Sequence, residues 1–221
     1  MGRFNKLQTL NYIKKTKVVP VFYDPSPEVA KEVASACYRG GIKILEFTNR
    51  GDFAWEVFRE LEKYCKSNLP EMILGAGSVS DSTMADMYIS MGANFIVGPL
   101  TNKDVSKSCN RKKIPYMPGC MTPTEISKAE EMGCDVVKVF PADSLGGASF
   151  VKSILAPMPW SWIMPTGGVD LEPDSLKKWF NAGVFSVGMG SKLFTSEIMN
   201  NKDWKLLENQ CKQLTETLKS I

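Results

Sequence analysis

Short runs of β-branched and aromatic residues alternate with longer amphipathic stretches along almost the whole chain, and this alternation constrains the fold more than any other feature. Eight runs predict strands, at residues 18–22, 42–47, 72–74, 95–97, 116–117, 136–140, 162–164 and 185–187. A helical stretch follows each of them, at residues 27–39, 52–66, 80–91, 103–109, 122–132, 148–155, 171–181 and 204–219. One more helix, around residues 6–15, precedes the first strand. Eight strand–helix units without a linker predict a closed (β/α)₈ TIM barrel of the α/β class, with an N-terminal helix, as a single domain over residues 1–221.

Several joints carry residues that favour helix ends. Gly40, Gly41 and Gly133 directly follow predicted helices, where a residue in the left-handed conformation commonly ends a helix. The Thr-Pro-Thr-Glu stretch from Thr122 to Glu125 is typical of a capping box with proline at the first helical position.

Histidine is absent from the sequence, and this removes several kinds of active site at once. Ser-His and Cys-His nucleophile pairs and histidine-ligated metal sites are excluded, so acid–base chemistry falls to Glu, Asp, Lys, Tyr or water. The six cysteines lie far apart without a Cys-x-x-Cys pair, which argues against a zinc or redox motif. We therefore expect neither a metal nor a cofactor.

The charge pattern argues against two classes of partner. The 27 basic and 24 acidic residues are spread along the chain, so no basic block of the kind that binds nucleic acid or an anionic membrane is present. No apolar run approaches the roughly 18 residues needed to span a bilayer, and no signal-peptide core follows the first residues. We expect a cytoplasmic protein that binds a small molecule, with no nucleic-acid or membrane partner.

Lys138 lies in an apolar run, Val-Val-Lys-Val-Phe, where burial of its charge is costly. Because side chains alternate along a strand, Lys138 shares a face with Phe140, and we expect that face to point into the barrel. Near the carboxyl end of its strand the lysine would reach the mouth, where desolvation frees an amine to attack a carbonyl. A lysine that extends to solvent from the strand end is the alternative.

Glu46 and Arg50 belong to the second predicted strand and the residues after it. The alternation places Glu46 inside the barrel below its mouth, where a partly buried carboxyl can move protons near neutral pH. Arg50, just past the strand, offers a planar fork that suits a substrate carboxylate. A buried Glu–Arg pair with a purely structural role is the alternative.

Glycine-rich segments end the third, seventh and eighth strands. Gly167 and Gly168 follow Thr166 after the seventh strand, and Gly190 with Ser191 follows the eighth. Barrels often bind phosphate with the backbone amides of these two loops and a short extra helix, for which residues 191–194 are the candidate. Tight corners without a ligand are the alternative reading. After the third strand, Ser78 places a hydroxyl at the same mouth.

Taken together, these segments resemble the 2-keto-3-deoxy-6-phosphogluconate (KDPG) and 2-keto-4-hydroxyglutarate (KHG) aldolases, a class I family of small barrel enzymes. The similar stretches occur in the family's order and extend over roughly residues 15–195. They are residues 18–21, 40–50, 75–78, 138–143, 165–168 and 190–191.

The resemblance implies a role for each candidate residue. It makes Lys138 the Schiff-base lysine and Glu46 the general acid/base, and it assigns the substrate carboxylate to Arg50 and Ser78. The polyol and phosphate end would contact Thr166, Gly167, Gly168, Gly190 and Ser191. The resemblance also implies a homotrimer that needs no metal. Iminium formation at Lys138 provides the electron sink for C–C cleavage, which a histidine-free chain can perform.

Three positions depart from the family's usual pattern. Ser78 stands where threonine is common, and Gly98-Pro99-Leu100 replaces a Ser-Pro-Gly stretch. Lys192 follows Ser191 where an apolar residue is expected. These positions lie near the expected mouth, where we also predict Pro99 and Phe140 to form part of the pocket wall.

The sequence therefore predicts a class I aldolase that cleaves KDPG to pyruvate and glyceraldehyde 3-phosphate. Two alternatives within the family act on 4-hydroxy-2-oxoglutarate or on the galactonate epimer, 2-keto-3-deoxy-6-phosphogalactonate. A phosphosugar isomerase or decarboxylase barrel would use the same phosphate loops without a lysine in the sixth strand. A non-catalytic barrel that binds a phosphometabolite would need neither Lys138 nor Glu46.

Overall fold

The computed structural model describes residues 2–221, in which strands and helices alternate as the sequence predicts. The strands are β1 (Val18–Phe22), β2 (Ile44–Thr48), β3 (Ile73–Gly77), β4 (Ile96–Val97), β5 (Tyr116–Met117), β6 (Gly119–Cys120), β7 (Val137–Val139), β8 (Ile163–Pro165) and β9 (Val187–Met189). The helices are α1 (Lys6–Thr16), α2 (Pro27–Arg39), α3 (Ala54–Asn68), α4 (Ser82–Ser90), α5 (Lys103–Arg111), α6 (Pro123–Glu131), α7 (Gly147–Leu155), α8 (Pro173–Asn181), α9 (Ser196–Asn201) and α10 (Trp204–Ser220).

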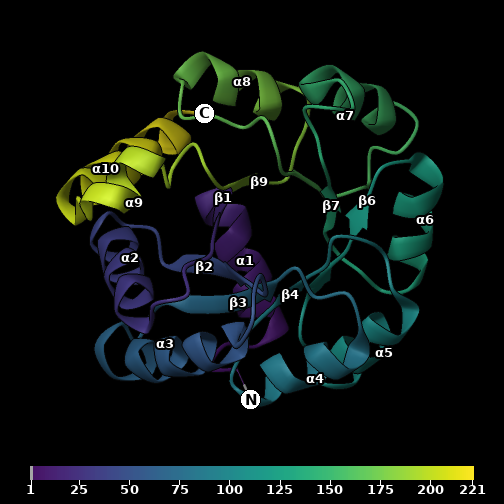
Figure 1. Cartoon of the computed structure of the whole chain (residues 1–221). Coiled ribbons are helices and arrows are strands. Elements are labelled where there is room, and N and C mark those ends of the chain that lie inside the picture. The colour runs from purple at the N-terminus through teal and green to yellow at the C-terminus, as the bar shows by residue number, and fades with distance from the viewer. Residues whose placement is uncertain (1) are drawn as a thin grey trace.

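All strand pairs are parallel, and the helices form a ring around them (Figure 1). One run of strands has the order β5-β4-β3-β2-β1-β9, and the other has the order β6-β7-β8. A bridge between Thr166 and Gly188, and the hydrogen bond from the Phe185 amide to the Ile163 carbonyl, connect β8 to β9. The strands β5 and β6 are two pieces of one barrel strand, interrupted at Pro118, which has no amide hydrogen to donate. The fold is the predicted (β/α)₈ barrel, with eight strand positions.

Helix α1 covers the amino-terminal end of the barrel. It lies near the centre of the ring in Figure 1, and Leu10 and Ile13 are buried on its inner side. The start of the chain is tied to residues that precede strands: the Phe4 amide donates to Asn94, and Lys6, the first residue of α1, pairs with Asp135 at 2.6 Å. The opposite end, where the strands finish, is left open for a ligand.

The predicted helix joints are largely confirmed. Thr122 and Glu125 form the capping box, with Pro123 at the start of α6. Gly41 and Gly133 have φ angles of 90° and 84°, the left-handed region that glycine tolerates best. Gly40 is the exception, because its φ of −74° is within the ordinary range.

Three features of the structure differ from the sequence prediction. Strand β3 continues through Gly75 and Gly77, although glycine normally weakens a strand. Residues 191–194 form a turn rather than a short helix: the amides of Leu193 and Phe194 both bond to the Gly190 carbonyl. The extra helix of this region is α9, which Thr195 caps and which the residue pattern did not indicate.

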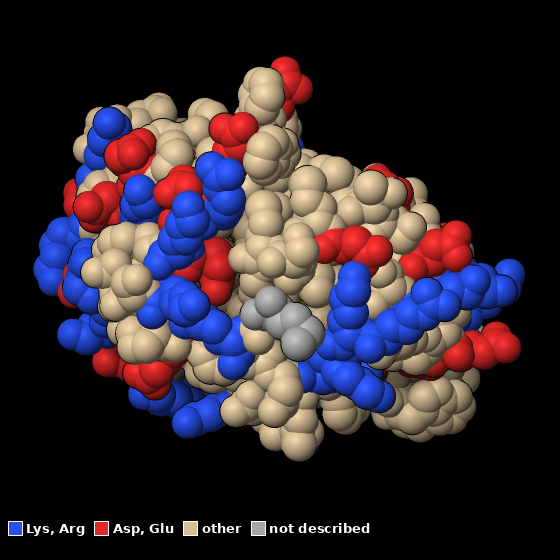
Figure 2. Space-filling view, turned by 90° about the horizontal axis from the view of Figure 1, so that it is seen from below, with Lys and Arg blue, Asp and Glu red and all other residues tan. Residues whose placement is uncertain are grey.

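Two sequence predictions, that no segment spans a membrane and that no basic block is present, concern the surface. Within residues 2–221, no helix combines the length and the apolar character needed to cross a bilayer. On the face shown in Figure 2, acidic side chains lie beside the basic ones.

Candidate active site

Lys138 lies inside the barrel on β7, as the alternation predicted. Its residue is only 7% exposed, and its backbone stands between Gly119 of β6 and Met164 of β8. The Nζ atom lies 5.1 Å from the centre of the Phe140 ring, on the same side of the strand. The side chain therefore does not reach bulk solvent, which contradicts the alternative of a lysine extended from the strand end.

Glu46 faces Lys138 from β2 and is fully buried. Its Oε1 atom lies 3.8 Å from Lys138 Nζ, an ion-pair distance that is too long for a direct hydrogen bond. Within residues 2–221, neither carboxyl oxygen has a hydrogen-bond partner. Burial raises the pKa of Glu46, and the positive charges of Lys138 and Arg50 partly offset this rise. A carboxyl in this state can hold a proton at higher pH than an exposed one.

Gly77 makes room for the Glu46 carboxyl. A Cβ atom at Gly77 would overlap Oε1 and the carboxyl carbon of Glu46. The close approach explains why a glycine occupies the end of β3, directly opposite Thr48 of β2.

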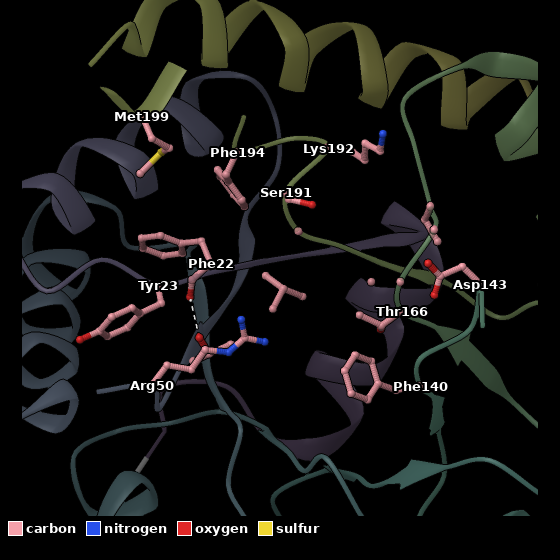
Figure 3. Close-up of a pocket in the computed structure, with 17 residues that line it drawn as sticks. Phe22, Tyr23, Arg50, Phe140, Asp143, Thr166, Ser191, Lys192, Phe194 and Met199 are labelled. Carbon is pink, nitrogen blue, oxygen red and sulfur yellow. Dashed lines mark hydrogen bonds between the residues drawn. The ribbon is translucent and has the colours of Figure 1, made fainter. Parts of the chain in front are cut away.

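A pocket of about 570 Å³ lies at the carboxyl ends of the strands (Figure 3). Thr48 and Phe140 line it, each two residues beyond Glu46 or Lys138 on the same face of its strand. Glu46 and Lys138 are not themselves lining residues, but Lys138 Nζ lies 5.1 Å from the centre of the Phe140 ring, which is one. The other lining residues are Val21, Phe22, Tyr23, Arg50, Asp143, Thr166, Gly167, Gly168, Val169, Gly188, Gly190, Ser191, Lys192, Phe194 and Met199.

Arg50 supplies a cation to the pocket, into which its guanidinium extends in Figure 3. Its Nε atom lies 3.5 Å from Ser78 Oγ, at the upper limit for a hydrogen bond. Ser78 is not among the lining residues and has a φ of 58°. Arg50 and Ser78 are thus neighbours, but of the two only Arg50 lines the pocket.

The two glycine loops form the other side of the pocket. Gly167 and Gly168 have φ angles of 98° and 69°, and a Cβ atom at Gly168 would overlap the Asp143 side chain. Gly190 has an ordinary φ, and a Cβ atom there would lie 3.5 Å from the Val21 carbonyl oxygen. No backbone carbonyl of residues 2–221 accepts a hydrogen bond from the amides of Gly168, Gly190 or Ser191. These amides are available to an anion.

Thr166 directly follows β8 and begins one of the two glycine loops. Its amide donates to the Val139 carbonyl of β7, and its own carbonyl accepts from the Ala142 amide. The hydroxyl is buried without a partner in the described chain, and it lies where a Cβ atom at Gly188 would overlap it. All five residues predicted for the polyol and phosphate end therefore line one pocket.

One predicted wall residue does not line the pocket. Pro99 is exposed, and its carbonyl lies over Gly119, since β4 ends two residues earlier and the chain turns outward there. Phe140, the other predicted wall residue, does line the pocket.

Several lining residues were not predicted from the sequence. Asp143 ends the same stretch that holds Lys138, and Tyr23 directly follows the first strand, so position at a strand end was a usable signal for both. Phe194 and Met199 come from the turn and helix after β9, which carry no comparable signal.

In the part of the chain that the structure describes, no three His, Cys, Asp or Glu side chains are close enough to hold a metal ion. All six cysteines are free and buried.

Comparison with known proteins identifies the family. The profile of "KDPG and KHG aldolase" matches residues 10–210, which is nearly the whole chain. The chain belongs to the KDPG and KHG aldolase family. It is therefore a class I aldolase, a carbon–carbon lyase, and the resemblance noted in the sequence is confirmed.

Individual relatives agree with this assignment. The chain is 27% identical to the 2-dehydro-3-deoxy-phosphogluconate aldolase of Haemophilus influenzae over 96% of its own length and 97% of that protein. It is 28% identical to the KHG/KDPG aldolase of Escherichia coli K12, over 91% and 92% of the two chains. The KDPG aldolase of Legionella pneumophila, solved with pyruvate as a covalent carbinolamine, superposes with a TM-score of 0.83 at 27% identity, over 94% and 98% of the chains.

Proposed function

We propose that this member of the family cleaves KDPG to pyruvate and glyceraldehyde 3-phosphate, through a Schiff base on Lys138. The observation that carries the proposal is the buried pair of Lys138 and Glu46, 3.8 Å apart, together with a pocket at the carboxyl ends of the strands that has a cation on one side and free amides on the other. Both groups that the chemistry needs are thus next to each other, and Thr48 and Phe140, each two residues further along the chain, line the ligand space.

The proposed reaction uses these groups in sequence. The neutral Lys138 amine attacks the C2 carbonyl of the keto acid, and loss of water gives an iminium ion. When the C3–C4 bond breaks, its electron pair moves into the iminium, and Glu46 takes the proton of the C4 hydroxyl to release the aldehyde. The enamine is then protonated at C3, and water hydrolyses the iminium to pyruvate and free Lys138. The raised pKa of Glu46 suits a group that must both accept and return a proton.

The two sides of the pocket suit the two ends of the substrate. Arg50, with Ser78 beside it, would bind the C1 carboxylate through its planar fork. The amides of Gly168, Gly190 and Ser191 would hold the phosphate, while Thr166 would contact the hydroxyls between the two ends.

The names of the relatives support this substrate and one alternative. The Haemophilus relative is named a 2-dehydro-3-deoxy-phosphogluconate aldolase, whereas the Escherichia coli relative is named for both KHG and KDPG. Cleavage of 4-hydroxy-2-oxoglutarate is therefore the second candidate. The galactonate epimer differs from KDPG in one hydroxyl configuration, and rates on all three substrates measured side by side rank the candidates.

Borohydride trapping tests the core of the proposal. Protein reduced in the presence of pyruvate should gain one pyruvate-derived adduct, and peptide mass mapping should place it on Lys138. Lys43, a partly exposed lysine paired with Glu71 at the other end of β2, serves as an internal control that should remain unlabelled. Labelling elsewhere, or no labelling, would contradict the Schiff-base assignment. The homotrimer stays a prediction, which sedimentation equilibrium would measure.

A further inference from the structure

The turn after β2, residues 49–53, contains Arg50 and is held by few stabilising contacts of its own. Arg50 is exposed, and its contact with Ser78 is long at 3.5 Å. Gly51 and Phe53 both have left-handed φ angles, 95° and 59°, and no side chain caps the start of α3. The direction of the Arg50 guanidinium therefore depends on what holds the beginning of the turn.

Asn49 holds that beginning from two sides. Its amide donates to the Gly77 carbonyl at 2.8 Å, which ties the turn to the end of β3. Its side-chain Oδ1 accepts a hydrogen bond of 2.8 Å from the Tyr88 hydroxyl. A backbone bond and a side-chain bond thus fix the residue that directly precedes Arg50.

Tyr88 is a rigid donor for this second bond. The residue is fully buried on α4, and its ring packs edge-on against Phe58 with centroids 5.0 Å apart at 89°. Phe58 in turn packs against Phe47 of β2. Burial raises the pKa of the Tyr88 phenol, so its hydroxyl keeps the proton that it donates to Asn49.

We infer that Asn49 and Tyr88 are positioning residues, which set the direction of Arg50 through the Tyr88–Asn49 hydrogen bond and so tune the affinity for the substrate carboxylate. The inference rests on the proposed function, in which Arg50 binds that carboxylate. Neither residue lines the pocket, so the effect must pass through the turn.

This role has a kinetic signature. The carboxylate is bound before, during and after C–C cleavage, so a misdirected Arg50 weakens all bound states alike. Loss of the hydrogen bond should then raise KM and leave kcat nearly unchanged. A general loosening of the barrel would instead lower kcat, because Lys138 and Glu46 depend on close packing.

The experiment compares Tyr88→Phe and Asn49→Ala with a matched control, Tyr64→Phe. Tyr64→Phe also removes one hydroxyl contact, that of Tyr64 with Ser35 at 3.0 Å. This contact joins α3 to α2 and does not involve the turn at residues 49–53. Two quantities are measured: steady-state KM and kcat with KDPG, and the pyruvate concentration that gives half-maximal borohydride labelling of Lys138. We expect both Tyr88→Phe and Asn49→Ala to raise KM and the half-labelling concentration about 3- to 10-fold, as for the loss of one hydrogen bond, with kcat within about twofold. Tyr64→Phe should change none of them.

The double variant Tyr88→Phe/Asn49→Ala decides whether one bond is responsible. If both residues act through it, the double variant should match the single variants, whereas independent effects would multiply. An active parent enzyme whose KM is unchanged in both single variants, or whose double variant shows multiplied effects, would overturn the inference. Absence of pyruvate labelling in the parent would instead overturn the proposed function, and this inference with it. Asn49→Ala changes only a partly exposed side chain, so the test does not depend on Tyr88→Phe folding.

Discussion

At the bottom of the proposed site the groups assigned to the chemistry are two buried side chains, Lys138 and Glu46, whereas at its rim, formed by the two glycine loops, the groups assigned to binding are backbone amides. The bottom must be desolvated to work, because burial raises the pKa of the Glu46 carboxyl and so lets it hold and return a proton. The rim remains open to water and binds through hydrogen-bond donors that no side-chain change removes directly. Substitutions at the bottom should therefore change turnover for every substrate. Substitutions at the rim should change only the preference among substrates.

Lys138→Ala should have the largest effect. Without the amine no iminium can form, so kcat should fall by roughly 10³-fold or more on phosphorylated and unphosphorylated keto acids alike. Steady-state assays with both substrates measure the loss, and circular dichroism checks that the barrel is intact. Comparable turnover in a folded Lys138→Ala protein would place the reacting amine elsewhere.

Glu46→Gln should come next. The amide keeps the size of the side chain but cannot accept a proton, and general acid–base catalysis is worth on the order of 10²- to 10⁴-fold. We expect kcat to fall within that range for both substrates, while Lys138 can still be trapped with pyruvate. Turnover at the parent rate would leave Glu46 as a structural partner of the two nearby cations.

The same variant should also show how much burial of the Glu46 carboxylate lowers the free energy of unfolding. Burial raises the pKa of Glu46, so the folded parent protein holds this proton more tightly than the unfolded chain does. The stability contributed by the protonated form is complete below the ordinary carboxyl pKa of about 4.3 and is lost as pH rises through the raised value. Urea unfolding should therefore show Glu46→Gln gaining stability relative to the parent from pH 4 to pH 8.

A matched control separates burial from charge alone. Glu60 is exposed, and its hydrogen bond with Lys63 lowers its pKa. Glu60→Gln should therefore show no gain in stability with rising pH. A flat difference for Glu46→Gln over the same range would mean that its carboxyl is not perturbed.

The contrast between bottom and rim also explains what could be predicted from the sequence. Lys138 and Glu46 could be found because strand alternation fixes which face a residue occupies, and a charge in an apolar run stands out. The end of β3 could not be predicted in this way. Gly77 is needed there because it leaves room for Glu46, which lies 31 positions earlier in the sequence and packs against it only in the folded chain. The turn at 191–194 and the departure of Pro99 from the pocket depend on loop geometry, for which residue pattern is a weak guide.

Gly190→Val should test the rim without straining the backbone. Gly190 has an ordinary φ, unlike Gly168, so a side chain there acts by occupying space in the pocket and blocking the approach to its amide. Loss of hydrogen bonds to a charged group should lower kcat/KM for KDPG roughly tenfold or more relative to 4-hydroxy-2-oxoglutarate. Gly190→Ala should give a smaller shift in the same direction. An unchanged ratio in both variants would mean that the phosphate does not bind at this loop.

Lys192→Ala should have the smallest effect, and it tests whether charge at the rim adds to the amides. Lys192 stands where the family was expected to have an apolar residue; it is exposed at the outer edge of the pocket, beyond Ser191 (Figure 3). An exposed charge interacts with a ligand through high-dielectric solvent, where a pair 4 Å apart gains about 1 kcal/mol, or about fivefold. We expect kcat/KM for KDPG to fall by about two- to fivefold in low salt, with kcat unchanged. Because the Debye length shrinks to about 3 Å at 1 M salt, parent and variant should then differ little.

Thr195→Ala, a change just beyond the turn that removes only a helix cap, provides the control for local loosening. A difference between Lys192→Ala and the parent that persists at 1 M salt would mean that Lys192 contacts the phosphate directly, which would make this part of the rim a desolvated site like the bottom.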